Sequence, residues 1–264
     1  MNRGMLRRVL IALAVAVVAS SCGGDDSASP ATTTTTDDLS GSIVVSAAAS
    51  LTAAFGQIGA AFEAAHKNAK VTFNFGASSA LATQILEGAP ADVFASADEA
   101  NMAKLAAEGR IVGAAHVFAT NLLTIVTKPG NPKAINGLQD LAAAGVVSLC
   151  GIEVPCGKYA QAALDHAGVT IPESSVTRGQ NVTATLTAVA DGDAVAGIVY
   201  VTDAKSNAKV ATVAIPAADN VVATYPVARL ARAAQSAVAK AFVAYVLSKA
   251  GQRVLRSFGF LPAT

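Results

Sequence analysis

From residue 42 onward, the chain alternates short apolar runs with turns of small residues and longer segments of helical periodicity. Residues 43–47 form a continuous apolar run, which is typical of a buried strand. Large apolar residues then recur at helical spacing over residues 51–62, which predicts an amphipathic helix with Ser50 as its N-cap. The chain therefore begins its folded part with a strand, a tight turn and a helix.

The same alternation continues to the C-terminal end of the chain. Further strands are predicted at residues 71–75, 92–95, 121–128, 146–149, 197–201 and 209–215. Helices are predicted at residues 79–87, 98–109, 157–166 and 182–190, and two more between 236 and 258, separated near Ala250 and Gly251. Asp98 and Asp203 are expected to cap helices. Strands that alternate with helices indicate a parallel α/β architecture.

Two extended apolar segments, residues 120–126 and 223–227, are interpreted as crossings between two lobes. Lobe 1 would then consist of residues 41–121 together with 225–264, and lobe 2 of residues 122–224. In such a fold the ligand is expected in the crevice between the lobes, where the carboxyl ends of strands face helix N-termini.

The N-terminus has the pattern of an export signal. Three arginines precede an apolar stretch at residues 10–19, and small residues then lead to Cys22. This pattern predicts a signal peptide over residues 1–21, which is too short to span a membrane as a helix. A cysteine after small residues resembles a lipoprotein cleavage site, so Cys22 is a predicted lipidation site; ordinary cleavage that leaves a spare cysteine is the alternative.

Residues 22–40 contain almost no apolar side chains and include a run of threonines, so they are predicted to be a disordered tether. The mature chain would be exported and anchored by lipid alone to the outer face of the cell membrane. Without the three signal arginines it carries 16 basic and 18 acidic residues, a net charge of −2. It has no basic stripe, which argues against nucleic acid as a partner.

Two further cysteines, Cys150 and Cys156, lie six positions apart. In an exported protein this spacing favours a disulfide. A metal site is the alternative, but the three histidines, at positions 66, 116 and 166, share no ligand spacing with each other or with the cysteines.

Two serines stand where a predicted strand gives way to a helix. Ser50 follows three alanines, and Ser78 follows Gly76 and Ala77. Such a junction presents free backbone N–H groups and the positive end of a helix dipole, which together favour an anion. No lysine or arginine lies beside either serine, so the sequence predicts an anion held by hydrogen bonds alone. The plainer alternative is that each serine simply caps its helix.

Five segments, in this order along the chain, resemble the molybdate-binding proteins of bacterial ABC importers. They are AAASL at 47–51, FGASSAL at 75–81, GAPADVFASAD at 88–98, GIVYVTDA at 197–204 and YPV at 225–227. The resemblance covers nearly all of residues 42–262. It implies a type II periplasmic-binding fold, a monomer without a cofactor, which closes on molybdate or tungstate and delivers the anion to a membrane permease.

The resemblance also implies which residues bind the oxyanion. The hydroxyls of Ser50, Ser78 and Tyr200 and the backbone N–H groups of Cys156 and Val182 are expected to contact it. The chain departs from the family pattern at Cys156, where a small residue such as alanine is usual. Because the backbone would bind there, a cysteine is tolerable, and its disulfide would stiffen the loop.

The chemistry of these groups agrees with a fully deprotonated oxyanion. Molybdate carries no proton at neutral pH and needs donors only, whereas phosphate carries a proton and would need an acceptor. Sulfate has the same charge as molybdate but is smaller, and remains an alternative ligand, as do a ferric ion and an organic acid bound by Arg178. An exported hydrolase is a further alternative, but the chain contains no Gly-x-Ser-x-Gly motif.

Overall fold

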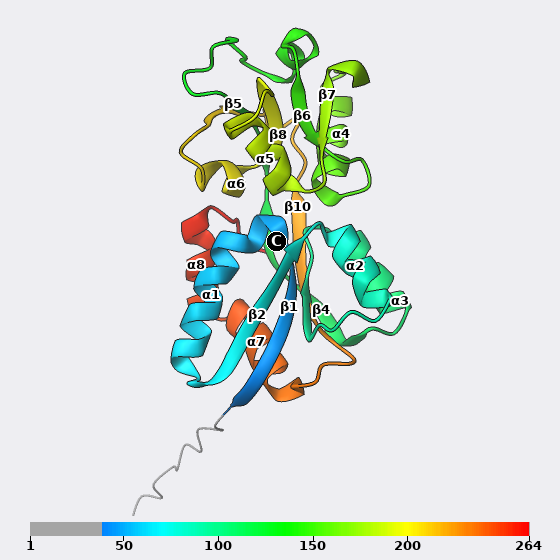
Figure 1. The fold of residues 1–264 in the computed structure, drawn as a ribbon, viewed down its shortest axis with the longest axis vertical. Helices are drawn as coiled ribbons and strands as arrows, with labels where there is room; N and C mark the ends of the chain where they lie inside the picture. The colour runs from blue at the N-terminus through cyan, green and yellow to red at the C-terminus, as the bar shows by residue number, and fades with distance from the viewer. Residues whose placement is uncertain (1–38, 264) are drawn as a thin grey trace, which may run out of the picture. The chain divides into compact units, whose positions relative to one another are not determined.

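The computed structural model describes residues 39–263 of the chain. The predicted signal peptide, the lipidation site at Cys22 and all but the last two residues of the predicted tether lie outside the described residues. Within that range the strands form two five-stranded sheets, and helices pack against both (Figure 1).

The first sheet is built mainly from the N-terminal half of the described chain. Its strands lie in the order β2–β1–β3–β10–β4. They are β1 (Ser40–Ala48), β2 (Asn68–Gly76), β3 (Val93–Ala95), β4 (Ile111–Asn121) and β10 (Ala223–Leu230). Strands β1, β2 and β3 are parallel, whereas β10 is antiparallel to both β3 and β4. Helices cover both faces of β1, which lies between β2 and β3, and Ile43 and Val45 are fully buried there.

The second sheet repeats the same plan. Its strands lie in the order β7–β6–β8–β5–β9. They are β5 (Leu123–Thr127), β6 (Val147–Cys150), β7 (Val176–Gly179), β8 (Ala196–Tyr200) and β9 (Ala211–Ala214). Strands β6, β7 and β8 are parallel, and β5 is antiparallel to β8 and β9. Each sheet thus has one antiparallel strand, and that strand comes directly after the chain has crossed from the other sheet.

The chain passes between the sheets at two places, from β4 to β5 and from β9 to β10. The two crossings are joined by one side chain. Asn220, just before β10, accepts a hydrogen bond from the Leu123 N–H at 3.0 Å and donates one to the Leu123 carbonyl at 2.8 Å. This paired contact fixes the two crossing segments side by side.

Helices lie on opposite sides of the first sheet (Figure 1). Helices α1 (Thr52–Ala65), α7 (Ser236–Leu247) and α8 (Lys249–Phe258) contact one another on one side, and α2 (Ser78–Leu86) and α3 (Glu99–Ala107) pack together on the other. The predicted apolar face of α1 is buried: Phe62 packs edge-on against Phe242 of α7, with ring centroids 5.4 Å apart.

Against the second sheet pack α4 (Pro155–His166), α5 (Val182–Ala190) and the short α6 (Val201–Lys205). Three short 3₁₀ segments complete the fold: Ala49–Leu51, Leu138–Ala143 and Glu173–Ser175. In both sheets the carboxyl end of a parallel strand leads directly into a helix, and these junctions define the site described below.

The α/β fold class is confirmed, and four details of the prediction are corrected. Strands β5 and β10 run antiparallel, so neither sheet is purely parallel. Strand β4 was not predicted because its first half is solvent-exposed and lacks apolar alternation. Helices α7 and α8 meet at Ser248, where the serine hydroxyl accepts a hydrogen bond from the Gly251 N–H. Gly251 lies inside α8, where a Cβ would come within 2.3 Å of the Tyr245 carbonyl oxygen.

The fourth correction concerns Ser50. It lies inside the 3₁₀ segment Ala49–Leu51, and the N-cap of α1 is Leu51, without a side-chain cap bond. Ser50 is therefore not the cap of α1, which leaves its hydroxyl for another role.

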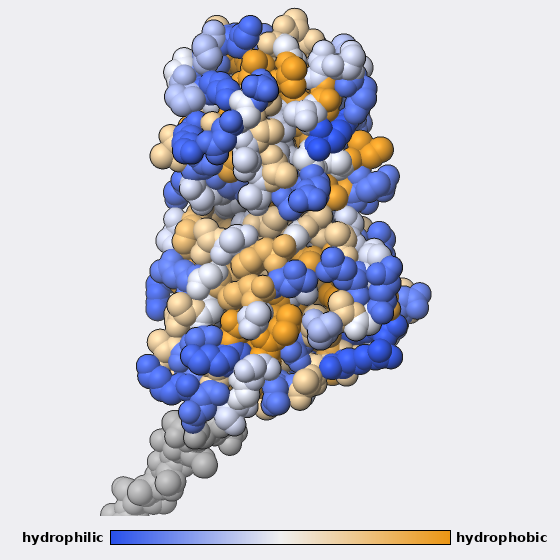
Figure 2. All heavy atoms as spheres, in the orientation of Figure 1, coloured by the Kyte–Doolittle hydropathy of each residue, from blue (hydrophilic) through white to orange (hydrophobic). Residues whose placement is uncertain are grey.

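The exposed surface is mixed in character. Figure 2 shows hydrophilic and hydrophobic residues interspersed over the visible face. The large apolar side chains that are exposed come from separate segments of the described chain, namely Val112, Val146, Ile152, Val222, Leu247 and Leu261. Among the helices that the structure describes, none is both long enough and apolar enough to cross a membrane.

Candidate functional site

Six strand-to-helix junctions, three from each sheet, line one pocket. The pocket and its opening to solvent together span about 220 Å³. Its lining consists of Ala48, Ala49, Ser50, Gly76, Ala77, Ser78 and Ala97 from the first sheet's side and Val154, Pro155, Cys156, Asn181, Val182 and Tyr200 from the second sheet's side. All five residues predicted to bind the oxyanion are in this lining. Most of the other members are small, which lets the backbone of each junction come close to a ligand.

The two serines are both buried, and neither hydroxyl caps its own helix. The Ser50 hydroxyl lies 2.9 Å from the hydroxyl of Tyr225 on β10. The Ser78 hydroxyl accepts a hydrogen bond from the Ala97 N–H at 3.0 Å. The alternative that each serine caps its own helix is therefore wrong in this structure. Each serine hydroxyl instead forms a hydrogen bond with a residue of another segment, Tyr225 for Ser50 and Ala97 for Ser78.

The start of α4 presents one backbone donor. Pro155 is the first residue of α4 and has no N–H, and the N–H groups of Gly157 and Lys158 both donate to the Val154 carbonyl at 3.0 and 3.1 Å. The Cys156 N–H is thus the first-turn donor of α4 that is left without a helical acceptor. It lies at the positive end of the helix dipole, where an anion is favoured.

A disulfide holds this donor in place. Cys156 is bonded to Cys150 at the end of β6, with the two Cα atoms 5.7 Å apart. The loop is also packed tightly, because a Cβ at Gly157 would come within 1.9 Å of the Gly151 carbonyl oxygen. The Thr185 hydroxyl of α5 lies 3.3 Å from the Cys150 sulfur, which links the starts of α4 and α5.

The start of α5 presents the second backbone donor. Asn181 caps this helix, and its side-chain oxygen accepts from the Ala184 N–H at 3.0 Å. The Thr185 N–H donates to the Asn181 carbonyl at 3.1 Å. The Val182 N–H, in the first turn, has no intrahelical acceptor and lies in the pocket lining. The Asn181 side chain thus satisfies the Ala184 N–H and leaves the Val182 N–H for a ligand.

Tyr200 supplies a hydroxyl that has no partner among the described residues. The residue ends β8, is 1% exposed, and its hydroxyl makes no hydrogen bond within residues 39–263. Burial, followed by the proximity of Tyr225, raises its pKa well above the ordinary value of a tyrosine. The hydroxyl therefore keeps its proton. A buried donor without a partner is costly, and a ligand in the pocket would satisfy it.

The pocket offers donors without any formal charge. Within residues 39–263 no aspartate, glutamate, lysine or arginine lines it. Asp203 lies nearby but lines a neighbouring cavity, and burial raises its pKa to about 7. Hydroxyls, backbone amides and helix N-termini can hold a small anion that has no proton to donate.

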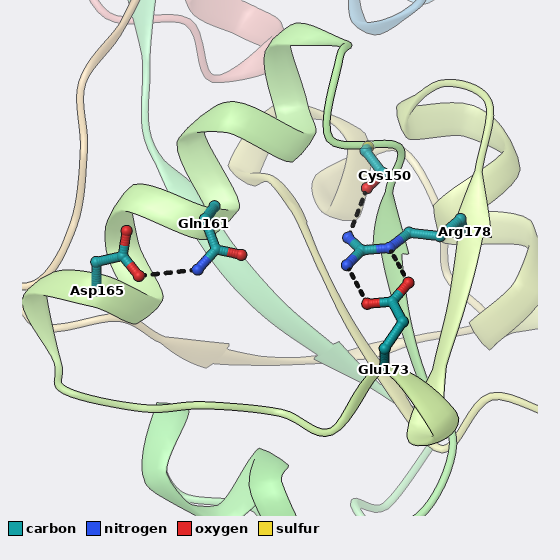
Figure 3. A network of polar contacts seen from close by, with 5 residues as sticks. All are labelled: Cys150, Gln161, Asp165, Glu173 and Arg178. Carbon is teal, nitrogen blue, oxygen red and sulfur yellow. Dashed lines mark hydrogen bonds and ion pairs between the residues drawn. The ribbon is translucent and has the colours of Figure 1, made fainter.

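Figure 3 shows the contacts of Arg178, the residue that would bind an organic acid if one were the ligand. Its guanidinium donates to both carboxylate oxygens of Glu173, at 2.9 and 2.6 Å, and to the Cys150 carbonyl at 3.1 Å. The hydrogen bonds from Arg178 lower the pKa of Glu173. Arg178 is not in the pocket lining. It stabilises the outer side of the β6–α4 loop, and nothing in its contacts supports an organic acid as ligand.

The other chemical candidates are distributed elsewhere. Asp98 caps α3 as predicted, accepting from the Asn101 N–H at 2.9 Å. Asp203 is not the cap of α6, because that helix starts at Val201 and Asp203 lies within it. Among the described residues, no group of three or more histidine, cysteine, aspartate or glutamate side chains could hold a metal ion. Sequence reasoning missed the contacts that Tyr225 and the Ala97 N–H make with the two serines.

The two sheets with their covering helices, and a pocket lined from both, are the architecture of a solute-binding protein. The sequence profile of the family described as bacterial extracellular solute-binding protein matches residues 43–261, and the chain belongs to this family. The chain is 45% identical over 215 residues to the molybdate-binding protein ModA of Mycobacterium tuberculosis H37Rv, a match that covers 81% of this chain and 82% of the relative.

Solved structures agree with the fold. The periplasmic molybdate-binding protein of Azotobacter vinelandii matches with a TM-score of 0.76 at 21% identity, over 84% of this chain and 100% of that one. The sulfate-binding protein SubI of M. tuberculosis H37Rv matches with a TM-score of 0.75 at 20% identity, over 84% and 87% of the two chains. At these identities the structural similarity shows the fold alone. Because the two TM-scores are nearly equal, the fold does not distinguish molybdate from sulfate as the ligand.

Proposed function

We propose that this protein captures molybdate or tungstate outside the cytoplasm and delivers it to the permease of an ABC importer. The observation that carries the proposal is the charge-free pocket of donors, in which the buried Tyr200 hydroxyl has no partner within the described chain. The 45% identity to a molybdate-binding protein supports the same ligand class.

In this proposal the oxyanion accepts hydrogen bonds from five groups. Three are the hydroxyls of Ser50, Ser78 and Tyr200, and two are the N–H groups of Cys156 and Val182. All five line the pocket. A hydrogen bond to an anion contributes about 1.5–3 kcal/mol, so no single group dominates. Hydrogen phosphate fits less well, because its proton would find no carboxylate in the lining.

We propose that residues 41–121 with 225–264 form one lobe and residues 122–224 the other. The donors come from both, so a bound anion would hold the lobes together in a closed form that the permease recognises. The sequence pattern further supports export with a signal peptide over residues 1–21, a lipid anchor at Cys22 and a tether over residues 22–40. The proposal also includes a monomeric state, which the family resemblance implies. No cofactor enters the proposal.

Isothermal titration calorimetry with molybdate and tungstate tests the ligand. Ser50→Ala and Ser78→Ala should each weaken binding by about 10- to 150-fold, the equivalent of one hydrogen bond to an anion. Ser79→Ala is the matched control, because this neighbouring serine of the same helix does not line the pocket. Absence of heat with both anions in the unaltered protein would overturn the proposal, as would equal losses in the Ser79 and Ser78 variants.

A further inference from the structure

The hydrogen bond between Ser50 and Tyr225 has a direction that its surroundings determine. Tyr225 is fully buried on β10, and the hydrogen-bonding groups recorded around its hydroxyl are Ser50 Oγ at 2.9 Å and Asn121 Nδ2 at 3.5 Å. A hydroxyl has one proton to donate. Which of these two neighbours receives that proton decides whether Ser50 acts as donor or acceptor in the pocket.

Asn121 cannot receive it. Its side-chain oxygen accepts from the Leu122 N–H at 3.0 Å, so its amide nitrogen is the group that faces Tyr225. The same nitrogen donates to the Thr202 hydroxyl at 2.8 Å. An amide nitrogen is a donor only. Among the described residues, Ser50 Oγ is therefore the one acceptor for the Tyr225 proton, and the proton of Ser50 is left for the pocket.

The second serine is set in the same way by a different group. Ser78 Oγ accepts from the Ala97 N–H at 3.0 Å, and a backbone N–H can never become an acceptor. The Ser78 proton is therefore also left for the pocket. Each of the two serine hydroxyls thus accepts a hydrogen bond from a donor that cannot become an acceptor in its surroundings.

We propose that Tyr225, itself oriented by Asn121, is a positioning residue that fixes the Ser50 hydroxyl as a donor to the bound oxyanion. The inference rests on the proposed function and deepens it by naming a residue that acts on the anion through Ser50. The Tyr225 proton occupies one of the two lone pairs of Ser50 Oγ, so the Ser50 proton cannot point toward Tyr225 and is directed to the pocket. Without the Tyr225 hydroxyl the Ser50 hydroxyl could rotate, and its hydrogen bond to the anion would be weaker.

The test compares the affinities of molybdate and of sulfate in matched variants. Calorimetric affinities are measured for the unaltered chain, for Tyr225→Phe, and for Tyr245→Phe as a matched control that removes a tyrosine hydroxyl from α7. Thermal melts of each variant verify folding.

Tyr225→Phe should weaken the binding of molybdate and of sulfate by about tenfold, the value of one buried hydrogen bond, because the Ser50 hydroxyl is then free to rotate. Tyr245→Phe should change neither affinity. Affinities that Tyr225→Phe leaves unchanged would overturn the inference.

A double-mutant cycle gives a second readout. If Tyr225 acts through Ser50, Tyr225→Phe should cost less than about twofold in molybdate affinity when Ser50→Ala is already present. An undiminished tenfold loss in that background would overturn the inference. If the unaltered protein binds sulfate but not molybdate, the proposed function fails, and the same cycle with sulfate still decides the role of Tyr225.

Discussion

Replacing Tyr200 by phenylalanine should affect ligand binding and stability in opposite directions. The Tyr200 hydroxyl is buried, and it has no hydrogen-bond partner within residues 39–263. In the ligand-free protein, an unsatisfied buried donor costs about 1–3 kcal/mol, which the phenylalanine variant would recover. The ring itself stays packed edge-on between Tyr159 and Tyr225, with centroids 6.5 and 6.0 Å away, so no cavity of consequence forms.

With the anion bound, the same hydroxyl is expected to make a hydrogen bond to a charged group, worth about 1.5–3 kcal/mol. Tyr200→Phe should therefore weaken molybdate binding by about 10- to 150-fold. For a domain of this size, 1–3 kcal/mol corresponds to an increase of roughly 2–12 °C in the melting temperature of the ligand-free variant.

The assay combines differential scanning calorimetry of the ligand-free proteins with titration calorimetry of molybdate. Tyr225→Phe serves as the contrast, because that hydroxyl is paired with Ser50 and its removal should lower the melting temperature. A ligand-free Tyr200→Phe protein that melts below the unaltered protein would refute the reasoning. So would an unchanged molybdate affinity.

Three further predictions follow from particular contacts. Gly157→Ala should weaken molybdate binding by at least tenfold and lower the melting temperature, because the new Cβ would lie 1.9 Å from the Gly151 carbonyl oxygen and displace the Cys156 N–H. An unchanged affinity in titration calorimetry would count against the Cys156 N–H as a donor to the anion. Burial raises the pKa of Asp203 in the folded state from 3.8 to about 7, so the folded form binds a proton that the unfolded form releases, and the free energy of unfolding should fall as pH rises from about 4 to 7. Urea unfolding of Asp203→Asn should lack this part of the pH dependence; the same pH dependence in the variant and the unaltered protein would contradict the prediction. Arg178→Gln should leave molybdate affinity within about twofold, because Arg178 pairs with Glu173 outside the pocket; a large loss in titration calorimetry would revive an organic acid as ligand.

Periodicity predicted those parts of the fold in which burial and chain direction follow from local sequence. The helix over residues 182–190 matches α5 in both bounds, because Asn181 caps it and apolar residues recur at the helical period. Strand β4 was missed, since much of it is exposed and its pairing with β10 depends on residues about a hundred positions away. The antiparallel direction of β5 and β10 could not be predicted either, because it follows from how the chain crosses between sheets.

The candidate site was predictable in its members but not in its hydrogen bonds. Local motifs pointed to Ser50 and Ser78, and the family resemblance added Cys156, Val182 and Tyr200; all five line one pocket. The contact between Ser50 and Tyr225 joins residues 175 positions apart, and no local pattern encodes it. The same holds for the Ala97 N–H, whose role depends on backbone geometry and not on the type of side chain.

The most direct test of the account is a crystal structure of the protein grown with molybdate, with the metal located by its anomalous scattering. The account predicts one strong peak in the pocket, with anion oxygens within hydrogen-bonding distance of the Ser50, Ser78 and Tyr200 hydroxyls and of the Cys156 and Val182 N–H groups. An empty pocket, or a peak that lies instead beside the arginines Arg110 and Arg232 of a separate cavity, would contradict it.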